Sequence, residues 1–176
     1  KVGWLTLYAG IAGGADIILL PEVPYDINKV VEAINKRTKA GKGFTILAVA
    51  EGAISKEDSS LTKKAYKAKV ADRKYPSVSY EIADQIYEAA GVEVRVTVPG
   101  HTQRGGSPCP YDRVLCTRLG SAAAKAIMDE DYGCMIAMIN GQTKRVPLAD
   151  VAGKLKMVDP NCQMIKEAKR IGISFG

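Results

Sequence analysis

The chain has 176 residues, of which 47% are hydrophobic and 25% charged, and its formal net charge at pH 7 is +6. This length is sufficient for one α/β domain, or for one domain and part of another, with a substantial core. No stretch approaches the roughly 20 apolar residues of a membrane-spanning helix, so we expect no membrane insertion.

The first predicted strand covers residues 15–20, an apolar run that lies between a glycine pair and Pro21. Such a run is typical of a strand buried on both faces. An amphipathic helix follows, with Asp26 as its N-cap, apolar residues at helical spacing from Ile27, and Gly41 as its stop signal. This alternation is the first sign of a βαβ arrangement.

A second buried strand is predicted at residues 44–50, and it ends on Glu51. An acid in that position lies at the carboxyl end of an apolar strand. Ligands bind at this end of the strands in open α/β sheets, so Glu51 is a candidate binding residue. A structural carboxylate that caps a loop is the alternative.

Residues 55–75 carry seven Lys or Arg and only three acids, which accounts for most of the net positive charge. The basicity is therefore local. The segment contains tyrosines but no nucleic-acid recognition motif, and we interpret it as a solvated surface excursion. No nucleic-acid partner is expected.

A helix is predicted at residues 80–90 and a strand at residues 92–98. In the strand, four valines alternate with Glu93, Arg95 and Thr97. This period of two places Arg95 on the polar face. Taken by itself, the pattern favours an ordinary surface arginine.

The segment 100–113 holds the only histidine, His101, three positions before Arg104 and just ahead of a glycine pair. Adjacent glycines let the backbone approach a ligand closely, and a guanidinium group suits phosphate oxygens. The loop therefore indicates a site for an anionic ligand. Without further context a lone histidine is more often structural.

A long helix is predicted at residues 111–130, a strand at 134–139, and helices at 147–155 and 161–171. Strands and helices thus alternate along the chain. The economical fold is α/β, with a largely parallel sheet, βαβ crossovers and flanking helices.

Four cysteines form no Cys-x-x-Cys pair, and with a single histidine they predict neither a zinc site nor a disulfide framework. We expect reduced, mostly buried thiols in a cytoplasmic protein. The sequence opens on Lys1 without a signal-peptide pattern, so we expect a piece of a longer chain. The cysteines are Cys109, Cys116, Cys134 and Cys162.

Several segments together resemble the C-terminal half of the bacterial 6-phosphofructokinases, in family order and spacing. They are Gly10–Asp16, Pro21-Glu22, Ala50-Glu51, Gly100–Arg113 and Ile171–Gly176. The resemblance implies Rossmann-like layers that are incomplete at the N-terminus. It also implies a partial fructose 6-phosphate-binding domain at 1–103, the C-terminal part of the donor-binding domain at 104–155, and a helix at 156–176 that returns to the substrate domain.

The activity implied by this resemblance is phosphorylation of fructose 6-phosphate at its 1-hydroxyl, a step of glycolysis. Glu51 resembles the acid that accepts hydrogen bonds from sugar hydroxyls, and His101 and Arg104 resemble the pair that contacts the sugar and its 6-phosphate. Arg95 resembles an arginine that reaches a neighbouring subunit's substrate, which implies a homodimer or homotetramer.

The resemblance also matches Gly14, Asp16 and Lys42 to an allosteric effector site of regulated relatives. For the side chains of Asp16 and Lys42, a structural role at loop ends is the favoured alternative. In the family, an N-terminal Gly-Gly-Asp-Gly loop holds Mg²⁺ and the phosphoryl donor, which is ATP or pyrophosphate, and a Thr-Ile-Asp-x-Asp segment supplies the catalytic aspartate. Neither motif occurs in this sequence.

Phosphoryl transfer depends on positioning two phosphates and neutralising their charge, so we expect no catalysis by this chain alone. It is then a fragment that lacks its N-terminal half, or it is completed by another polypeptide. The alternative is a non-catalytic sugar-phosphate-binding or regulatory module.

Overall fold

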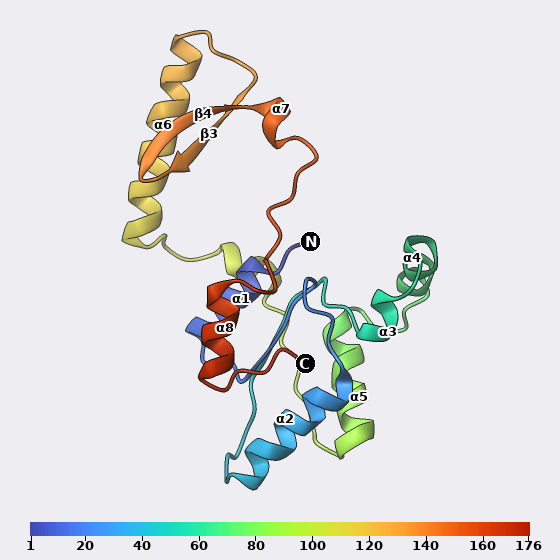
Figure 1. Cartoon of the computed structure of the whole chain (residues 1–176). Coiled ribbons are helices and arrows are strands. Elements are labelled where there is room, and N and C mark those ends of the chain that lie inside the picture. The colour runs from blue at the N-terminus through green and yellow to red at the C-terminus, as the bar shows by residue number, and fades with distance from the viewer. The chain divides into compact units, whose positions relative to one another are not determined.

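The computed structural model describes residues 1–176, which form two compact units (Figure 1). Unit 1 comprises Lys1–Thr97 and Lys156–Gly176, and unit 2 comprises Val98–Leu155. None of the helices combines the length and the apolar character that crossing a membrane requires.

Unit 1 contains five helices from its first segment, one helix from its second and a short parallel sheet. In chain order these are α1 (Trp4–Ala12), β1 (Ile17–Leu19), α2 (Ile27–Lys39), β2 (Leu47–Val49), α3 (Lys56–Ser59), α4 (Lys63–Ala71), α5 (Val78–Ala90) and, after unit 2, α8 (Gln163–Arg170).

The sheet of unit 1 is covered on both faces, as expected for parallel strands. Strands β1 and β2 pair in parallel, with Ile17 opposite Leu47 and Leu19 opposite Val49. Successive side chains point to opposite faces, so Ile18 packs with the helices α1 and α8, and its neighbours in β1 pack with α2 and α5. The α/β class and the parallel sheet are confirmed.

The local signals of α2 are confirmed. The Asp26 side chain accepts a hydrogen bond from the Asn28 backbone N–H at 3.0 Å, which satisfies one of the free donors at the helix start. The helix ends at Lys39, and Gly41 then takes a left-handed φ of 78°.

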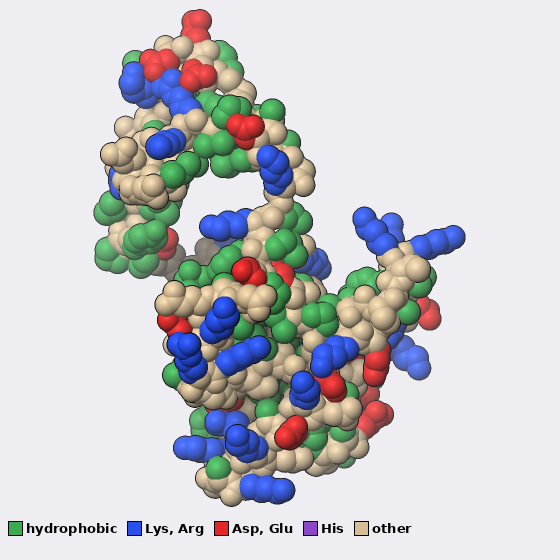
Figure 2. Space-filling model, viewed as in Figure 1, with side chains coloured by type: hydrophobic (Ala, Val, Ile, Leu, Met, Phe, Trp, Pro, Cys, Tyr) green, Lys and Arg blue, Asp and Glu red, His purple; other side chains and the backbone are tan.

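Helix α1 is a feature that the sequence reasoning did not predict. It lies close to the sheet because Gly10 has no side chain. A Cβ atom there would stand 2.7 Å from the Ile18 Cδ1. The basic excursion also contains two helices, α3 and α4, and Figure 2 shows Lys and Arg side chains reaching outward from this region.

Unit 2 contains η1 (Gly100–Arg104), α6 (Pro110–Met128), β3 (Cys134–Ile139), β4 (Gln142–Pro147) and α7 (Leu148–Val151). Strands β3 and β4 form an antiparallel hairpin. Its turn residues Asn140 and Gly141 have φ of 51° and 74°, the left-handed pair that an Asn-Gly hairpin turn adopts. The sequence reasoning missed β4 and expected one helix over residues 147–155, where only α7 forms.

Two further expectations are wrong. Residues 92–98 form no strand, because their backbone pairs with no other strand. The thiols are unpaired but not mostly buried. Cys109 and Cys116 are exposed, and the other two cysteines are half-buried.

Candidate functional site

Glu51 follows β2 directly, at the carboxyl end of the parallel strands, where the sequence placed it. Its carboxylate is largely exposed and forms an ion pair with the Lys1 ammonium group. It accepts no hydrogen bond from a backbone N–H, so it caps no loop in this structure. The carboxylate is therefore accessible to a polar ligand.

Arg95 lies in the segment of residues 92–97 that follows α5, which we call the strap. Its side chain is 90% exposed, and its one ion pair joins the guanidinium Nε to the Glu93 carboxylate at 3.4 Å. An exposed pair at this distance contributes little to stability. The guanidinium group is thus nearly free to bind an anion.

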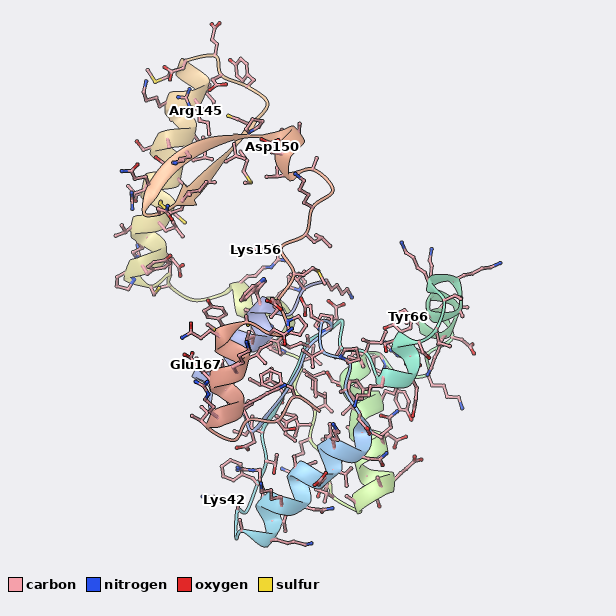
Figure 3. All side chains as sticks on the ribbon, viewed as in Figure 1. Lys42, Tyr66, Arg145, Asp150, Lys156 and Glu167 are labelled. Carbon is pink, nitrogen blue, oxygen red and sulfur yellow. The ribbon has the colours of Figure 1, made fainter.

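A cavity of about 460 Å³ lies in unit 1 between the strap and the elements α2, β2 and α5. Lys42 and Arg95 both line it, together with the hydroxyls of Thr38, Thr45 and Ser79. Lys42 belongs to the loop after α2 (Figure 3). The sequence reasoning assigned these two cations to different sites, whereas the structure brings them to one cavity.

His101 and Arg104 lie in η1, in unit 2, and both side chains are exposed. Neither makes a side-chain hydrogen bond or an ion pair within the chain. In the glycine pair that follows, Gly106 adopts a φ of 84°, which side-chain-bearing residues rarely adopt. The loop therefore presents two free donors, three residues apart.

The four candidate substrate residues are thus divided between the units. Unit 1 carries Glu51 and Arg95, and unit 2 carries His101 and Arg104. Each pair lies on exposed positions of its own unit.

The candidate effector residues have different surroundings. The Asp16 carboxylate accepts a hydrogen bond from the Ile46 N–H at 2.9 Å, and it pairs with the Arg37 guanidinium group at 2.8 Å. These contacts tie the start of β2 to α2 and suit a structural loop end. Gly14 has a φ of 70°, and Lys42 has no ion-pair partner. The effector assignment stays a prediction.

Glu22 was noted in the sequence only as part of a motif, and the structure gives it a specific role. Its Oε1 accepts hydrogen bonds from the Gly3 N–H at 3.0 Å and from the Val158 N–H at 3.1 Å. Near this point the Trp4 indole N–H donates to the Lys156 carbonyl at 2.8 Å (Figure 3). Glu22 therefore fixes the chain where it returns to unit 1, a contact that sequence spacing could not reveal.

A group of ionisable residues lies under the basic segment of residues 55–75. Burial, followed by the charges of Glu81 and Asp58, raises the pKa of Tyr25 to about 12. Asp58 forms an ion pair with Lys69 at 2.6 Å, and this hydrogen bond raises the pKa of Lys69. The ion pair between Asp58 and Lys69 anchors α4 to the rest of unit 1. None of these residues lines the cavity beside the strap.

The chain brings together no group of three or more His, Cys, Asp or Glu side chains that could hold a metal ion. Its candidate residues carry cations and hydrogen-bonding groups, which is the side-chain chemistry that suits an anion.

The family model described as Phosphofructokinase matches residues 1–127. The ATP-dependent 6-phosphofructokinase of Spirochaeta thermophila is 49% identical over 176 residues, which are 100% of this chain and 48% of that protein. The pyrophosphate–fructose 6-phosphate 1-phosphotransferase of Amycolatopsis methanolica is 42% identical over 159 residues, which cover 90% of this chain and 46% of that protein. The chain spans about half the length of the curated relatives it matches.

Solved structures agree with these matches. The T-state phosphofructokinase of Pichia pastoris superposes with a TM-score of 0.61 and 35% identity, over 84% of this chain and 16% of that chain. A pyrophosphate-dependent phosphofructokinase from Nitrosospira multiformis gives a TM-score of 0.70 over 99% of this chain and 42% of that chain. Its identity is 20%, so it supports the fold alone.

Proposed function

The chain belongs to the phosphofructokinase family, and on this premise we propose that it is the sugar-phosphate-binding half of a 6-phosphofructokinase. The reaction is transfer of a phosphoryl group to the 1-hydroxyl of fructose 6-phosphate. The observation that carries the proposal is the η1 loop, in which His101 and Arg104 are exposed and free of partners within the chain. The names of the relatives support the same reaction.

Each proposed contact follows from the chemistry of the side chain. Arg104 presents a planar fork of donors that matches two phosphate oxygens, and His101 adds a donor for the sugar or its 6-phosphate. Glu51 is an acceptor for sugar hydroxyls. Arg95 offers a second guanidinium group for an anion, and its weak contact to Glu93 is readily exchanged for a ligand.

The phosphoryl donor is proposed to be ATP or pyrophosphate, since relatives of both names match this chain. Mg²⁺ would neutralise the phosphate charge when bound. The residues of this chain do not group into a metal site. We therefore assign the metal and the phosphoryl donor to the N-terminal half that family members have and that this sequence does not include.

We propose that another polypeptide segment completes unit 2. Its support is the composition of the unit's interior, where Ala126 is the one buried hydrophobic residue. Large apolar side chains such as Tyr111, Val114 and Met128 are exposed on α6. A homodimer or homotetramer, as the resemblance implies, is part of the same proposal.

Calorimetric titration with fructose 6-phosphate tests the binding role. We expect weak binding by the chain and at least a tenfold loss in the Arg104→Ala variant, because a charge-assisted contact to phosphate is removed. Arg170→Ala, at an exposed position of α8, is the matched control and should bind like the parent chain. Equal affinity of the Arg104→Ala variant and the parent, both folded, would refute the proposed site.

An activity assay of the same samples with ATP or pyrophosphate and Mg²⁺ tests whether the donor site lies outside this chain. We expect no turnover by the chain alone. Turnover would show that this chain holds the donor site as well. Binding without turnover, even after a polypeptide carrying the donor motifs is added, would identify a non-catalytic sugar-phosphate-binding module.

A further inference from the structure

The first three residues of the chain lie across the carboxyl ends of β1 and β2. The Gly3 N–H donates to the carboxylate of Glu22, in the turn after β1, at 3.0 Å. Lys1 lies against Gly52, in the turn after β2. Ligands bind at this end of the strands in open α/β sheets. The segment therefore places the Lys1 ammonium group at the edge where Glu51 is found.

Two glycines allow the segment to lie so close to the strand ends. A Cβ atom added at Gly3 would stand 2.7 Å from the Glu22 Oε2, and one added at Gly52 would stand 3.1 Å from the Lys1 Cβ. Neither glycine has a positive φ. It is therefore the close approach, and not the backbone conformation, that favours glycine at these two positions.

The Lys1 ammonium group pairs with one oxygen of Glu51, Oε1, and with no other acid. Oε2 of the same carboxylate makes no hydrogen bond or ion pair within the chain, and the Glu51 side chain is 74% exposed. One oxygen is thus held and the other is open to a ligand. A free glutamate side chain loses conformational entropy when a ligand orders it, and a contact made beforehand reduces that loss.

We propose that Lys1 is a positioning residue for Glu51, and that Gly52 leaves the space in which Lys1 lies. Lys1 holds Oε1, so that Oε2 is presented as an acceptor for a hydroxyl group of the ligand. The inference rests on the proposed function for the identity of the ligand, a phosphorylated sugar. The pairing itself depends on unit 1 alone.

A comparison with a second ion pair separates this role from a stabilising one. Lys56 pairs with Asp26 at 3.7 Å, and its side chain is 51% exposed against 59% for Lys1. Asp26 is already used within the chain, because it caps α2 by accepting the Asn28 N–H. Exposed pairs contribute little to stability. The pair at Glu51 differs in leaving an acceptor that nothing in the chain uses.

The first test needs no ligand. NMR three-bond couplings measure the side-chain rotamers of Glu51 in the whole chain. We expect one dominant rotamer in the parent and averaged couplings in the Lys1→Met variant, and Lys1→Arg should keep the dominant rotamer. Lys56→Met, which removes an ammonium group of similar exposure, should match the parent. Averaged couplings in the folded parent would overturn the proposal.

The second test is an NMR titration with fructose 6-phosphate. We expect Lys1→Met to weaken binding by about two- to fivefold, the range that an exposed ion pair supports. Gly52→Ala should weaken it in the same direction, because the added methyl group displaces Lys1. Lys1→Arg should restore the parent affinity. Binding of inorganic phosphate, which has no sugar hydroxyl, should be the same in all of these proteins.

A double-mutant cycle shows whether Lys1 acts through Glu51. In the Glu51→Gln background, Lys1→Met should cause no further loss of affinity for fructose 6-phosphate. An equal loss in both backgrounds would overturn the proposal, since Lys1 would then contact the ligand itself. Unchanged affinity of the Lys1→Met variant would also overturn it. If the parent does not bind fructose 6-phosphate, the proposed function fails, and the rotamer measurement still decides whether Lys1 positions Glu51.

Discussion

The two units differ in how much of their own sequence they can bury. Apart from Ala126, all of the buried hydrophobic residues lie in unit 1, whose sheet is covered on both faces. Unit 2 has a helix and a hairpin but almost no interior. Burial of apolar surface is the main stabilising contribution to folding, so the stability of this chain resides in unit 1. The candidate ligand groups, in contrast, are divided between the two.

The largest effect that tests this comparison is a cavity in the core of unit 1. Ile18 is fully buried between the sheet and α1. We expect Ile18→Ala to lower the free energy of unfolding by about 2–5 kcal/mol. The matched control is Ile127→Ala in unit 2, at a residue that is 63% exposed, and it should change stability by less than about 0.5 kcal/mol. Urea unfolding measures both, and similar losses would show that unit 2 has a core of its own.

The next effect concerns the ionisation of Tyr25 in unit 1. Its pKa is raised to about 12, mainly by burial, so the folded state holds the phenol proton more tightly than the unfolded state does. The resulting stability is fully present below pH 10 and is lost as the pH rises from 10 through 12. A difference of two units corresponds to about 2–3 kcal/mol.

The Tyr25→Phe variant separates this contribution from other alkaline titrations. We expect its stability between pH 10 and 12 to fall less steeply than that of the parent, because no buried phenol has to ionise. The same substitution should have a small effect at pH 7. Identical slopes for the two proteins in urea unfolding at several alkaline pH values would contradict the burial argument.

Two glycines give the units opposite responses to the same change. A methyl group at Gly10 would meet Ile18, so Gly10→Ala should destabilise unit 1 by about 1–3 kcal/mol. At Gly120, in the middle of α6, no atom lies within 4 Å of the added carbon. Gly120→Ala should therefore raise the helical stability of unit 2 by about 0.5–1 kcal/mol. Thermal unfolding followed by circular dichroism measures both, and a loss at Gly120 would indicate packing in unit 2 that this structure does not contain.

Much of unit 1 could be predicted from its sequence because the signals there are local. The apolar run of β1 and the cap and stop of α2 each depend on a few neighbouring residues. The prediction of a strand at residues 92–98 was wrong because strand pairing depends on a partner, which the alternation of valines cannot specify. In unit 2 the Asn140-Gly141 turn was a readable hairpin signal, and it was overlooked.

In the candidate site, too, the features set by local sequence could be predicted and those set by tertiary contacts could not. The position of Glu51 after an apolar strand followed from the pattern of the strand, although β2 is only half-buried. The shared cavity of Lys42 and Arg95 could not be predicted, because these residues are far apart in the sequence and the cavity depends on how the strap lies. The contacts of Asp16 and Glu22 to backbone N–H groups are likewise tertiary.

The smallest expected effect is the response of unit 2 to acid. Arg145 pairs with Asp131 at 2.9 Å and with Asp129, so the hairpin is joined to the end of α6 (Figure 3). Hydrogen bonds from Arg145 and then Lys125 lower the pKa of Asp129 below its ordinary value of 3.8. The stability from this contact is therefore present above that ordinary value and is lost as the pH falls through the lower, folded-state pKa.

Because these groups are exposed, their contribution is small and is screened by salt. NMR spectra recorded from pH 5 down to pH 2 should show the resonances of β4 shifting or broadening before those of β1, and the Asp129→Asn variant should lose this early step. Simultaneous loss of both sets of resonances would mean that the units unfold together. That outcome would contradict the comparison, because the hairpin would then share the stability of the buried sheet in unit 1.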